Sequence, residues 1–188
     1  MKTYRNAERT RQWIRRAFTE LMAEKREIEK ITVTELCARA DISKTTFYYH
    51  YEDIYAVAEK FENELIDRLS ASLSGFAENG QSAVENLECC TRETIAYLKA
   101  HETEYRIAMR ASSTQLFAEK LKKILAKKMA ENLRGIFGDV APDRWQVQVC
   151  FVTSACVDVV AEYYRGGLPV PFDTVTDVLL EALRKLCA

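Results

Sequence analysis

The segment ISKTTFYYHYED, residues 42 to 53, gathers aromatic rings, hydroxyl groups, a lysine and a histidine within twelve positions. Phe47, Tyr48 and Tyr49 are consecutive, so on a helix their rings must point in different directions and some must face solvent. Lys44 adds a cation and the neighbouring threonines add hydroxyls. Exposed rings beside hydroxyls and a cation indicate a binding surface.

The rest of the chain lacks the spacings that are typical of an enzyme. No nucleophile stands beside a base, and no glycine-rich phosphate loop occurs. The six cysteines show no CxxC spacing, and the two histidines lie far apart, so no metal constellation is recognisable. We therefore expect no catalytic residue, no metal and no cofactor; a helical enzyme is kept as the less favoured alternative.

Charge is distributed unevenly along the chain. Residues 1 to 50 carry eleven Lys and Arg against seven Asp and Glu, a net charge of +4, whereas residues 51 to 188 carry sixteen against twenty-one, a net charge of -5. A basic amino-terminal part on an acidic body is expected when one end meets a polyanion. The charged amino terminus lacks the apolar region of a secretion signal, which predicts a cytoplasmic protein with reduced thiols.

Three helices are predicted before residue 52, one long and two short. Apolar residues at helical spacing predict a first helix over residues 5–25. Thr32 followed by Glu35 forms a capping box that opens a short second helix, and Ser43 can cap an equally short third one. Two short helices joined by a tight turn form a helix-turn-helix, in which Phe47 would pack inward.

On this interpretation the third helix is the one that meets nucleic acid. Lys44, Thr45 and Tyr49 project outward, and Lys44 can read a guanine edge. The remaining polar side chains of this helix, Thr46, Tyr48 and His50, suit phosphate oxygens.

Apolar periodicity predicts six further helices, most of them with their own start or stop signals. Ser82 with Glu85 forms a second capping box, Gly138 ends the seventh helix, Pro142 fits the first turn of the eighth, and Asp173 caps the ninth. The expected helices cover residues 53–73, 82–99, 105–109, 117–137, 142–165 and 173–187.

The segment 145–160 is ambiguous because it is rich in β-branched residues and partly alternating, so a strand is locally possible. It is too long for a typical strand and has no partner strand. Its thirteen uncharged residues before Asp158 are also too few to cross a membrane, which takes ~20 residues. A helix buried on more than one face is the remaining interpretation, and such a helix usually lies at a subunit interface.

Residues 31 to 60, ITVTELCARADISKTTFYYHYEDIYAVAEK, resemble the signature of the TetR family of bacterial transcriptional regulators. The threonine-capped second helix, the Thr-Phe-Tyr-x-His-aromatic run and the long following helix match in register. The resemblance implies an all-α protein of about nine helices, with a helix-turn-helix DNA-binding domain over residues 1–52 and a ligand-binding and dimerisation domain over residues 53–188. The predicted DNA-contacting residues are Thr32, Thr34, Lys44, Thr45, Thr46, Tyr48, Tyr49 and His50.

Two positions depart from the family pattern. The family usually has glycine in the turn, where this chain has Asp41; aspartate tolerates a left-handed backbone better than most residues, so the turn can survive. The family commonly places a phosphate-gripping lysine where this chain has Ile54. One phosphate contact is therefore missing, or is supplied by Tyr55 or Tyr51.

The resemblance further implies a homodimeric repressor that leaves a palindromic DNA operator when a small hydrophobic ligand binds among the fourth to eighth helices. The alternative is the same DNA-binding module regulated by a protein partner. Asp158 would meet either a cationic ligand or, by preference, protein donors. The candidate cavity residues are Tyr97, Tyr105, Met109, Phe117, Phe151 and Asp158. In a four-helix bundle formed by the last two helices and their twofold copies, the candidate contacts are Val147, Val178, Leu179 and Leu183.

Overall fold

The computed structural model describes residues 2–73, 83–111, 116–132 and 141–187, and these ranges are helical with short connections. They contain nine α-helices and one short 3-10 turn, and no strand occurs within them. The prediction of an all-α fold is confirmed, and the ambiguous segment 145–160 lies inside one long helix.

The amino-terminal helices begin where side-chain caps predict. The Thr32 hydroxyl accepts from the Glu35 amide at 3.2 Å, and the Glu35 carboxylate accepts from the Thr32 amide at 3.1 Å. The Ser43 hydroxyl accepts from the Thr46 amide at 3.0 Å. Because each cap satisfies amides that a helix start leaves without partners, these short helices are defined locally. The elements are α1 (Lys2–Lys25), a 3-10 turn (Ile28–Lys30), α2 (Val33–Ala40) and α3 (Lys44–His50).

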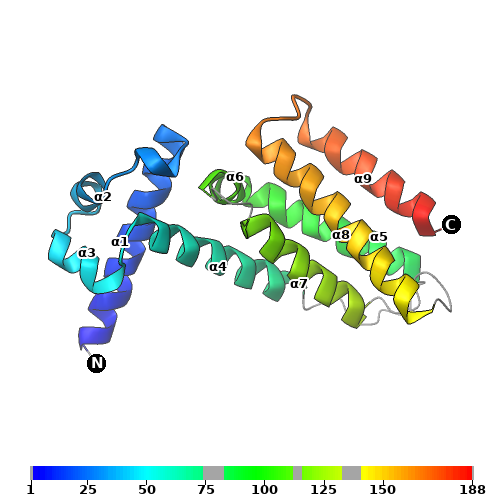
Figure 1. Cartoon of the computed structure of the whole chain (residues 1–188), viewed down its shortest axis with the longest axis horizontal. Helices are drawn as coiled ribbons and strands as arrows, with labels where there is room; N and C mark the ends of the chain where they lie inside the picture. Colours follow the sequence, from blue (N-terminus) through cyan, green and yellow to red (C-terminus); the bar gives the residue numbers. More distant parts are fainter. Residues whose placement is uncertain (1, 74–82, 112–115, 133–140, 188) are drawn as a thin grey trace.

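The remaining helices form the body of the molecule, and Figure 1 shows α4 running from the amino-terminal helices into it. Asp53 caps α4 through its carboxylate, which accepts from the Ala56 amide at 2.8 Å. Pro142 lies in the first turn of its helix, as predicted. The body comprises α4 (Ile54–Ser72), α5 (Ala83–Ala100), α6 (Glu102–Ala111), α7 (Leu116–Asn132), α8 (Pro142–Arg165) and α9 (Phe172–Cys187).

The start of α9 differs from the prediction. The helix begins at Phe172, and Asp173 lies in its first turn instead of capping it. The Pro171 carbonyl accepts from the Thr174 amide at 3.0 Å, which starts the helical bonding earlier. Asp173 instead accepts from the Lys99 ammonium at 2.6 Å and so ties α9 to α5. The predicted cap at Ser82 and the predicted stop at Gly138 lie outside the described residues.

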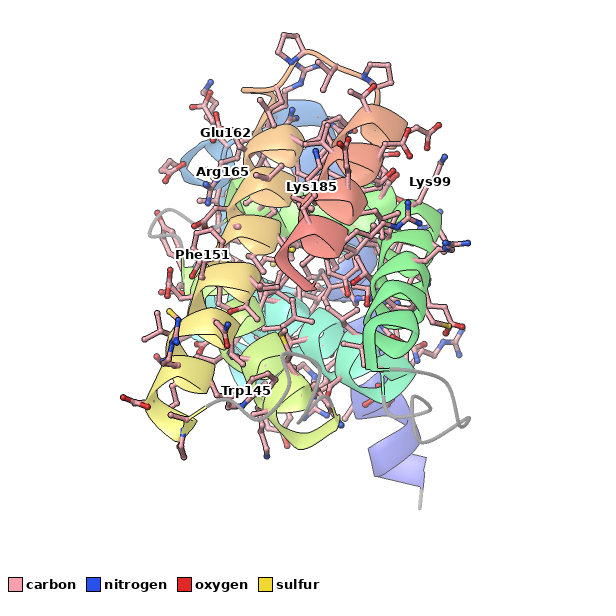
Figure 2. The ribbon with its side chains drawn as sticks, turned by 90° about the vertical axis from the view of Figure 1, so that its right-hand side faces the viewer. Lys99, Trp145, Phe151, Glu162, Arg165 and Lys185 are labelled. Atoms are coloured by element: carbon pink, nitrogen blue, oxygen red, sulfur yellow. The ribbon has the colours of Figure 1, made fainter. Side chains whose placement is uncertain are left out.

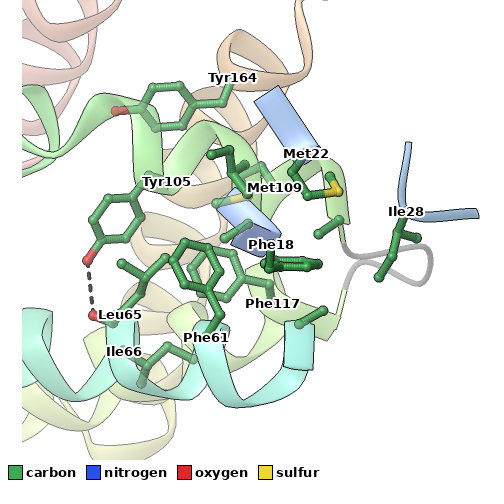
Figure 3. Close-up of a cluster of buried hydrophobic side chains, with 14 of the residues drawn as sticks. Phe18, Met22, Ile28, Phe61, Leu65, Ile66, Tyr105, Met109, Phe117 and Tyr164 are labelled. Carbon is green, nitrogen blue, oxygen red and sulfur yellow. Dashed lines mark hydrogen bonds between the residues drawn. The ribbon is translucent and has the colours of Figure 1, made fainter. Parts of the chain in front are cut away.

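A continuous apolar core joins the amino-terminal helices to the body (Figure 3). Phe18 of α1 meets Phe61 of α4 edge to face, with ring centroids 5.9 Å apart. Farther into the body, Tyr105 of α6 lies 6.2 Å from Phe117 of α7. The amino-terminal helices and the body therefore share one packed core.

By length and composition alone, helix α8 could cross a membrane, which corrects the expectation drawn from its thirteen uncharged residues; core helices of soluble proteins have the same properties. It packs against α6, α7 and α9. Val152, Val157 and Val160 are buried, whereas Val147 and Phe151 are exposed, so one side of α8 faces the body and the other faces outward.

Candidate nucleic-acid interface and ligand cavity

Phe47 explains how three consecutive aromatic residues can share one short helix. Its side chain is fully buried and holds α3 against the amino-terminal core. The Tyr48 ring meets it edge to face at 5.4 Å, and the Tyr51 ring lies 6.1 Å away. With Phe47 pointing inward, the 100° step of a helix turns Tyr48 and Tyr49 outward, where they are 57% and 82% exposed.

The turn between α2 and α3 forms without glycine. Asp41 adopts a left-handed backbone with φ 53° and ψ 48°, as the departure from the family pattern requires. The Ile42 amide donates to the Cys37 carbonyl at 3.0 Å, which closes the end of α2. Cys37 is buried where the two helices approach, so the angle between α2 and α3 is fixed by packing as well as by the turn.

The predicted residues of α3 are exposed to different extents. Lys44 and Thr45 are exposed. Thr46 is half-buried, and its hydroxyl lies 2.8 Å from that of Ser43. His50 is also half-buried; burial and, to a lesser extent, the Arg11 charge lower the pKa of its ring, which favours the neutral form. In that form His50 can still donate one hydrogen bond to a phosphate oxygen.

The two threonines predicted at the start of α2 also differ. The Thr32 hydroxyl lies 2.9 Å from a Glu35 carboxylate oxygen, and so it is engaged in the helix cap. Hydrogen bonds from Lys25 first, then from Thr32, lower the pKa of Glu35 to about 2, which keeps the cap charged over the ordinary pH range. Thr34 faces solvent in the first turn of the helix.

Ile54, the second departure from the family pattern, is buried at the start of α4 and cannot reach a phosphate. The Tyr51 ring packs on Phe47 and is half-buried. Tyr55, by contrast, is 51% exposed in the first turn of α4. Of the two residues that could replace the missing lysine contact, Tyr55 is the one at the surface.

A cavity of about 130 Å³, partly open to the surface, lies in the body between α4, α5, α6, α7, α8 and α9. Its wall is made mainly of aliphatic side chains, with the rings of Tyr105 and Tyr164 and the thioethers of Met109 and Met129 among them. Tyr105 donates its hydroxyl to the Leu65 carbonyl of α4 at 3.1 Å (Figure 3). One wall residue is therefore bonded directly to the helix that follows the recognition helix.

The predicted cavity residues divide into three groups. Tyr105 and Met109 line the cavity. Tyr97 and Phe117 pack behind Tyr105, each with its ring centroid 6.2 Å from the Tyr105 ring. Phe151 does not reach the cavity: it lies 59% exposed on the outer side of α8 (Figure 2).

Asp158 was also placed wrongly by the sequence pattern. Its side chain is 59% exposed and pairs with the Lys122 ammonium of α7 at 2.8 Å. The expectation of a buried carboxylate fails because the apolar run of α8 covers only part of the helix circumference. A protein donor nevertheless meets its charge, in line with the preferred alternative.

The four residues predicted at the dimer interface point in two directions. Val147 and Val178 are exposed, at 69% and 60%. Leu179 and Leu183 are buried and line the cavity instead. Residues 178 and 179 are successive on a helix and so lie about 100° apart, which puts one outside and one inside. Phe151 lies one turn after Val147 on α8 and belongs with the exposed pair.

Metal binding finds no support in the ranges that the structure describes. Within them, no group of three or more His, Cys, Asp or Glu side chains is placed to hold a metal ion.

Comparison with known proteins gives a weak match in sequence and a strong one in fold. No family model matches the chain. An uncharacterised helix-turn-helix transcriptional regulator of Bacillus subtilis, YxbF, is 31% identical over 74 residues, which is 37% of this chain and 20% of the relative. The chain thus matches only about a fifth of the length of that relative.

Solved structures match over nearly the whole chain. A structure from Syntrophomonas wolfei assigned to the TetR family superposes with a TM-score of 0.71 at 16% identity, covering 97% of this chain and 96% of the other. A TetR-family regulatory protein from Rhodococcus RHA1 gives a TM-score of 0.65 at 17% identity, covering 94% and 96%. NalD from Pseudomonas aeruginosa, the secondary repressor of a multidrug efflux pump, gives 0.64 at 17% identity, covering 96% of each chain. The chain therefore has the fold of TetR-family transcriptional regulators, which confirms the resemblance seen in its amino-terminal motif.

Proposed function

We propose that this protein is a homodimeric, DNA-binding transcriptional repressor of the TetR type, released from its operator by a small hydrophobic molecule. The observation that carries the proposal is the outward face of α3, with Lys44, Thr45 and Tyr49 held at the surface by the buried Phe47. The fold supports it, since NalD, which shares that fold, is itself a repressor. A regulator acting on bacterial DNA would reside in the cytoplasm and would need no enzymatic activity and no cofactor.

The proposal divides the chain at the end of the recognition helix. Residues 1–52 would bind DNA, and residues 53–188 would bind the ligand and the second subunit. Lys44, Thr45 and Tyr49 would read base edges in the major groove, whereas Thr46, Tyr48 and His50 would hold phosphates. Tyr55 would supply the phosphate contact that the buried Ile54 cannot make.

A second copy of the chain would cover the apolar outer face of α8 and α9. Val147, Phe151 and Val178 are exposed on these two helices. Figure 2 shows Phe151 on the outer side of α8. If these side chains form one patch, it would mark an interaction site. A twofold interface uses the same patch on both subunits. The two recognition helices would then enter successive major grooves ~34 Å apart, so the operator would be palindromic.

Helix α6 would couple the cavity to DNA binding. Tyr105 lines the cavity and bonds to α4, and the preceding residue, Glu104, accepts from Arg15 of α1 at 2.5 Å and from Arg68 of α4 at 3.0 Å. A ligand that binds only one tilt of these helices would change operator affinity by the same factor as its preference for that tilt.

The test is operator binding by four variants of α3 on a DNA sequence selected from a random library. Lys44→Ala and Tyr49→Ala should each cost ~1–3 kcal/mol on the selected operator and relax its specificity. Thr46→Ala and Tyr48→Phe should weaken binding to all sequences alike, because phosphates carry no base information.

Lys123→Ala is the matched control, because Lys123 is an exposed lysine on α7, far from α3 in the fold. It should bind the selected operator as the parent does. If all four α3 variants keep the affinity and specificity of the parent, the assignment of α3 as the recognition helix is wrong. If a protein partner changes operator binding and no small molecule does, the proposed regulation by a ligand is wrong and regulation by that partner takes its place.

A further inference from the structure

We infer that the cavity takes an uncharged, apolar molecule of about the size of benzene or toluene, and that it rejects ions of the same shape. This inference deepens the proposed function, because it names the chemical class of the effector. The size of the cavity, its hydrogen bonding and the position of its charged groups each support it.

The size of the cavity sets the size of the ligand. Its volume is about 130 Å³. An apolar cavity of ~150 Å³ engineered into another protein stays dry and binds benzene. Sites for drug-sized ligands usually measure ~300–1,000 Å³. The space here therefore fits a compact molecule of roughly six to eight carbon atoms, by comparison with that engineered cavity.

Three of the hydroxyl groups of the wall already have acceptors within the protein. Tyr105 donates to the Leu65 carbonyl at 3.1 Å, Tyr164 donates to the Leu98 carbonyl at 3.2 Å, and Thr153 donates to the Val149 carbonyl at 2.7 Å. At these positions a polar ligand would have to break one of these bonds or bury its own polar group without a partner. An apolar ligand can enter without breaking any of these hydrogen bonds.

Charged groups in the wall also disfavour ionic ligands. Burial raises the pKa of the Cys156 thiol to about 11, so this wall group stays neutral. Among the described residues of the wall, Lys128 is the charged one; it is a half-buried cation and would repel a cationic ligand. Lys128 already interacts within the protein, so an anionic ligand would have to compete for its charge. Asp158, which could have attracted a cation, faces away and pairs with Lys122 at 2.8 Å.

A surface groove between α7 and α8 is the place where an anion could bind instead. Its volume is about 750 Å³, and Lys122, Lys123, Lys127 and Trp145 contribute to it. Thr153 lines both sites, but Val157 and Met129 line only the cavity, so an aromatic anion bound in the groove should respond little to substitutions at these two residues. Cavity variants therefore separate the two sites.

The experiment titrates the full-length protein, without DNA, with toluene, benzylammonium and benzoate in a calorimeter. These three compounds share a ring and differ in charge. Toluene should bind saturably, and the two ions should bind at least ~100-fold more weakly inside the cavity, because an ion without a partner cannot be buried there. Binding of either ion at the affinity of toluene, sensitive to the cavity variants, would overturn the inference.

Two variants change the cavity in opposite directions. Val157→Phe fills it and should weaken toluene binding by roughly tenfold or more, since the added ring takes the space of the ligand. Met129→Ala enlarges it and should move the preferred ligand from toluene to butylbenzene. Val170→Phe, in the exposed loop before α9, is the control and should bind as the parent does.

The shift in preferred size keeps the inference testable if Val157→Phe fails to fold. An unchanged size preference in Met129→Ala would overturn the inference. Because binding is measured without DNA, it is also separable from the proposed function. Toluene binding that leaves operator affinity unchanged would refute ligand-driven release while supporting the ligand class.

Discussion

The amino-terminal helices and the helical body are built from the same kind of element but are specified differently. In α2 and α3, a side-chain cap three residues from its amide defines each helix start, and one apolar residue, Phe47, decides which face is buried. In α8 and α9, apolar residues occur on both the inner and the outer face. The first region can be interpreted from short-range chemistry, whereas the second requires knowledge of which helices lie on each side.

The difference is sharpest at two adjacent residues of α9. Val178 and Leu179 are equally apolar, and both were predicted at the subunit interface. Val178 is 60% exposed, whereas Leu179 is 8% exposed and lines the cavity. Hydrophobicity alone does not distinguish the two environments, so substituting each residue in turn tests the division of α9 into two faces.

The largest effect is expected from introducing a charge at Leu179, with the same substitution at Val178 for comparison. Leu179→Glu should lower the free energy of unfolding by ~3–5 kcal/mol, because the carboxylate would be buried among aliphatic side chains without a partner. Val178→Glu should leave that energy within ~0.5 kcal/mol, as is usual for a surface substitution. Thermal or denaturant unfolding measures both at concentrations where the protein is monomeric.

The charge at Val178 should act on association instead of on stability. Val178→Glu should shift the protein from dimer to monomer in sedimentation, because it places a charge on the apolar outer face. A fully dimeric Val178→Glu would show that the second copy does not cover this face. A stable Leu179→Glu would show that the assignment of the inner face is wrong.

These contrasts also explain how far the sequence was informative. The caps at Thr32 and Ser43 and the left-handed Asp41 were predictable, because each depends on bonds within a few residues. The inward direction of Phe47 followed from helical geometry.

The placement of Phe151 and Asp158 was not predictable in the same way. Both lie on a helix with apolar residues on more than one face, and the packed neighbours α6, α7 and α9 decide which face is interior. The cavity itself is space left between six helices, and no local pattern encodes it.

Glu62 is an exception to the apolar packing of the body, and a second prediction concerns its charge. It is 6% exposed on α4, and a carboxylate oxygen lies 3.8 Å from the Lys120 ammonium. Burial, more than the attraction of Lys120, sets the pKa of Glu62, raising it from 4.5 to about 7. The repulsion of Glu59 acts in the same direction as burial.

Stability should therefore respond to pH with a defined sign at this position. Between pH 4.5 and about 7 the folded state holds a proton on Glu62 that the unfolded state has lost, so its contribution to stability falls as the pH rises. Glu62→Gln should raise the free energy of unfolding by ~1–2 kcal/mol above pH 7, and the gain should disappear near pH 4.5.

Glu59→Gln is the matched control, because Glu59 lies just under one turn before Glu62 on the same helix and is largely exposed. Its carboxylate also lies 3.8 Å from the Lys120 ammonium. The difference of this variant from the parent should change less with pH than that of Glu62→Gln, because the repulsion of Glu59 is the smallest of the three causes that set the pKa of Glu62. A gain for Glu62→Gln that is independent of pH would show that Glu62 is ionised in the fold throughout.

The smallest expected effect tests the link between the two regions. Tyr105→Phe keeps the ring in the cavity wall but removes the hydroxyl that donates to Leu65 of α4 at 3.1 Å. Tyr164→Phe removes a hydroxyl from the same wall, one that donates to Leu98 of α5 at 3.2 Å and so does not contact α4. Each variant should lose ~0.5–1.5 kcal/mol of stability, the usual net value of one hydrogen bond.

Both should bind a cavity ligand as the parent does, because the ring is retained. In an operator titration with and without that ligand, Tyr105→Phe should lose part of the ligand-induced change in affinity, by about fivefold for ~1 kcal/mol of coupling, whereas Tyr164→Phe should keep it. Equal coupling in the two variants would mean that the contact between Tyr105 and α4 does not carry the signal from the cavity to the recognition helix.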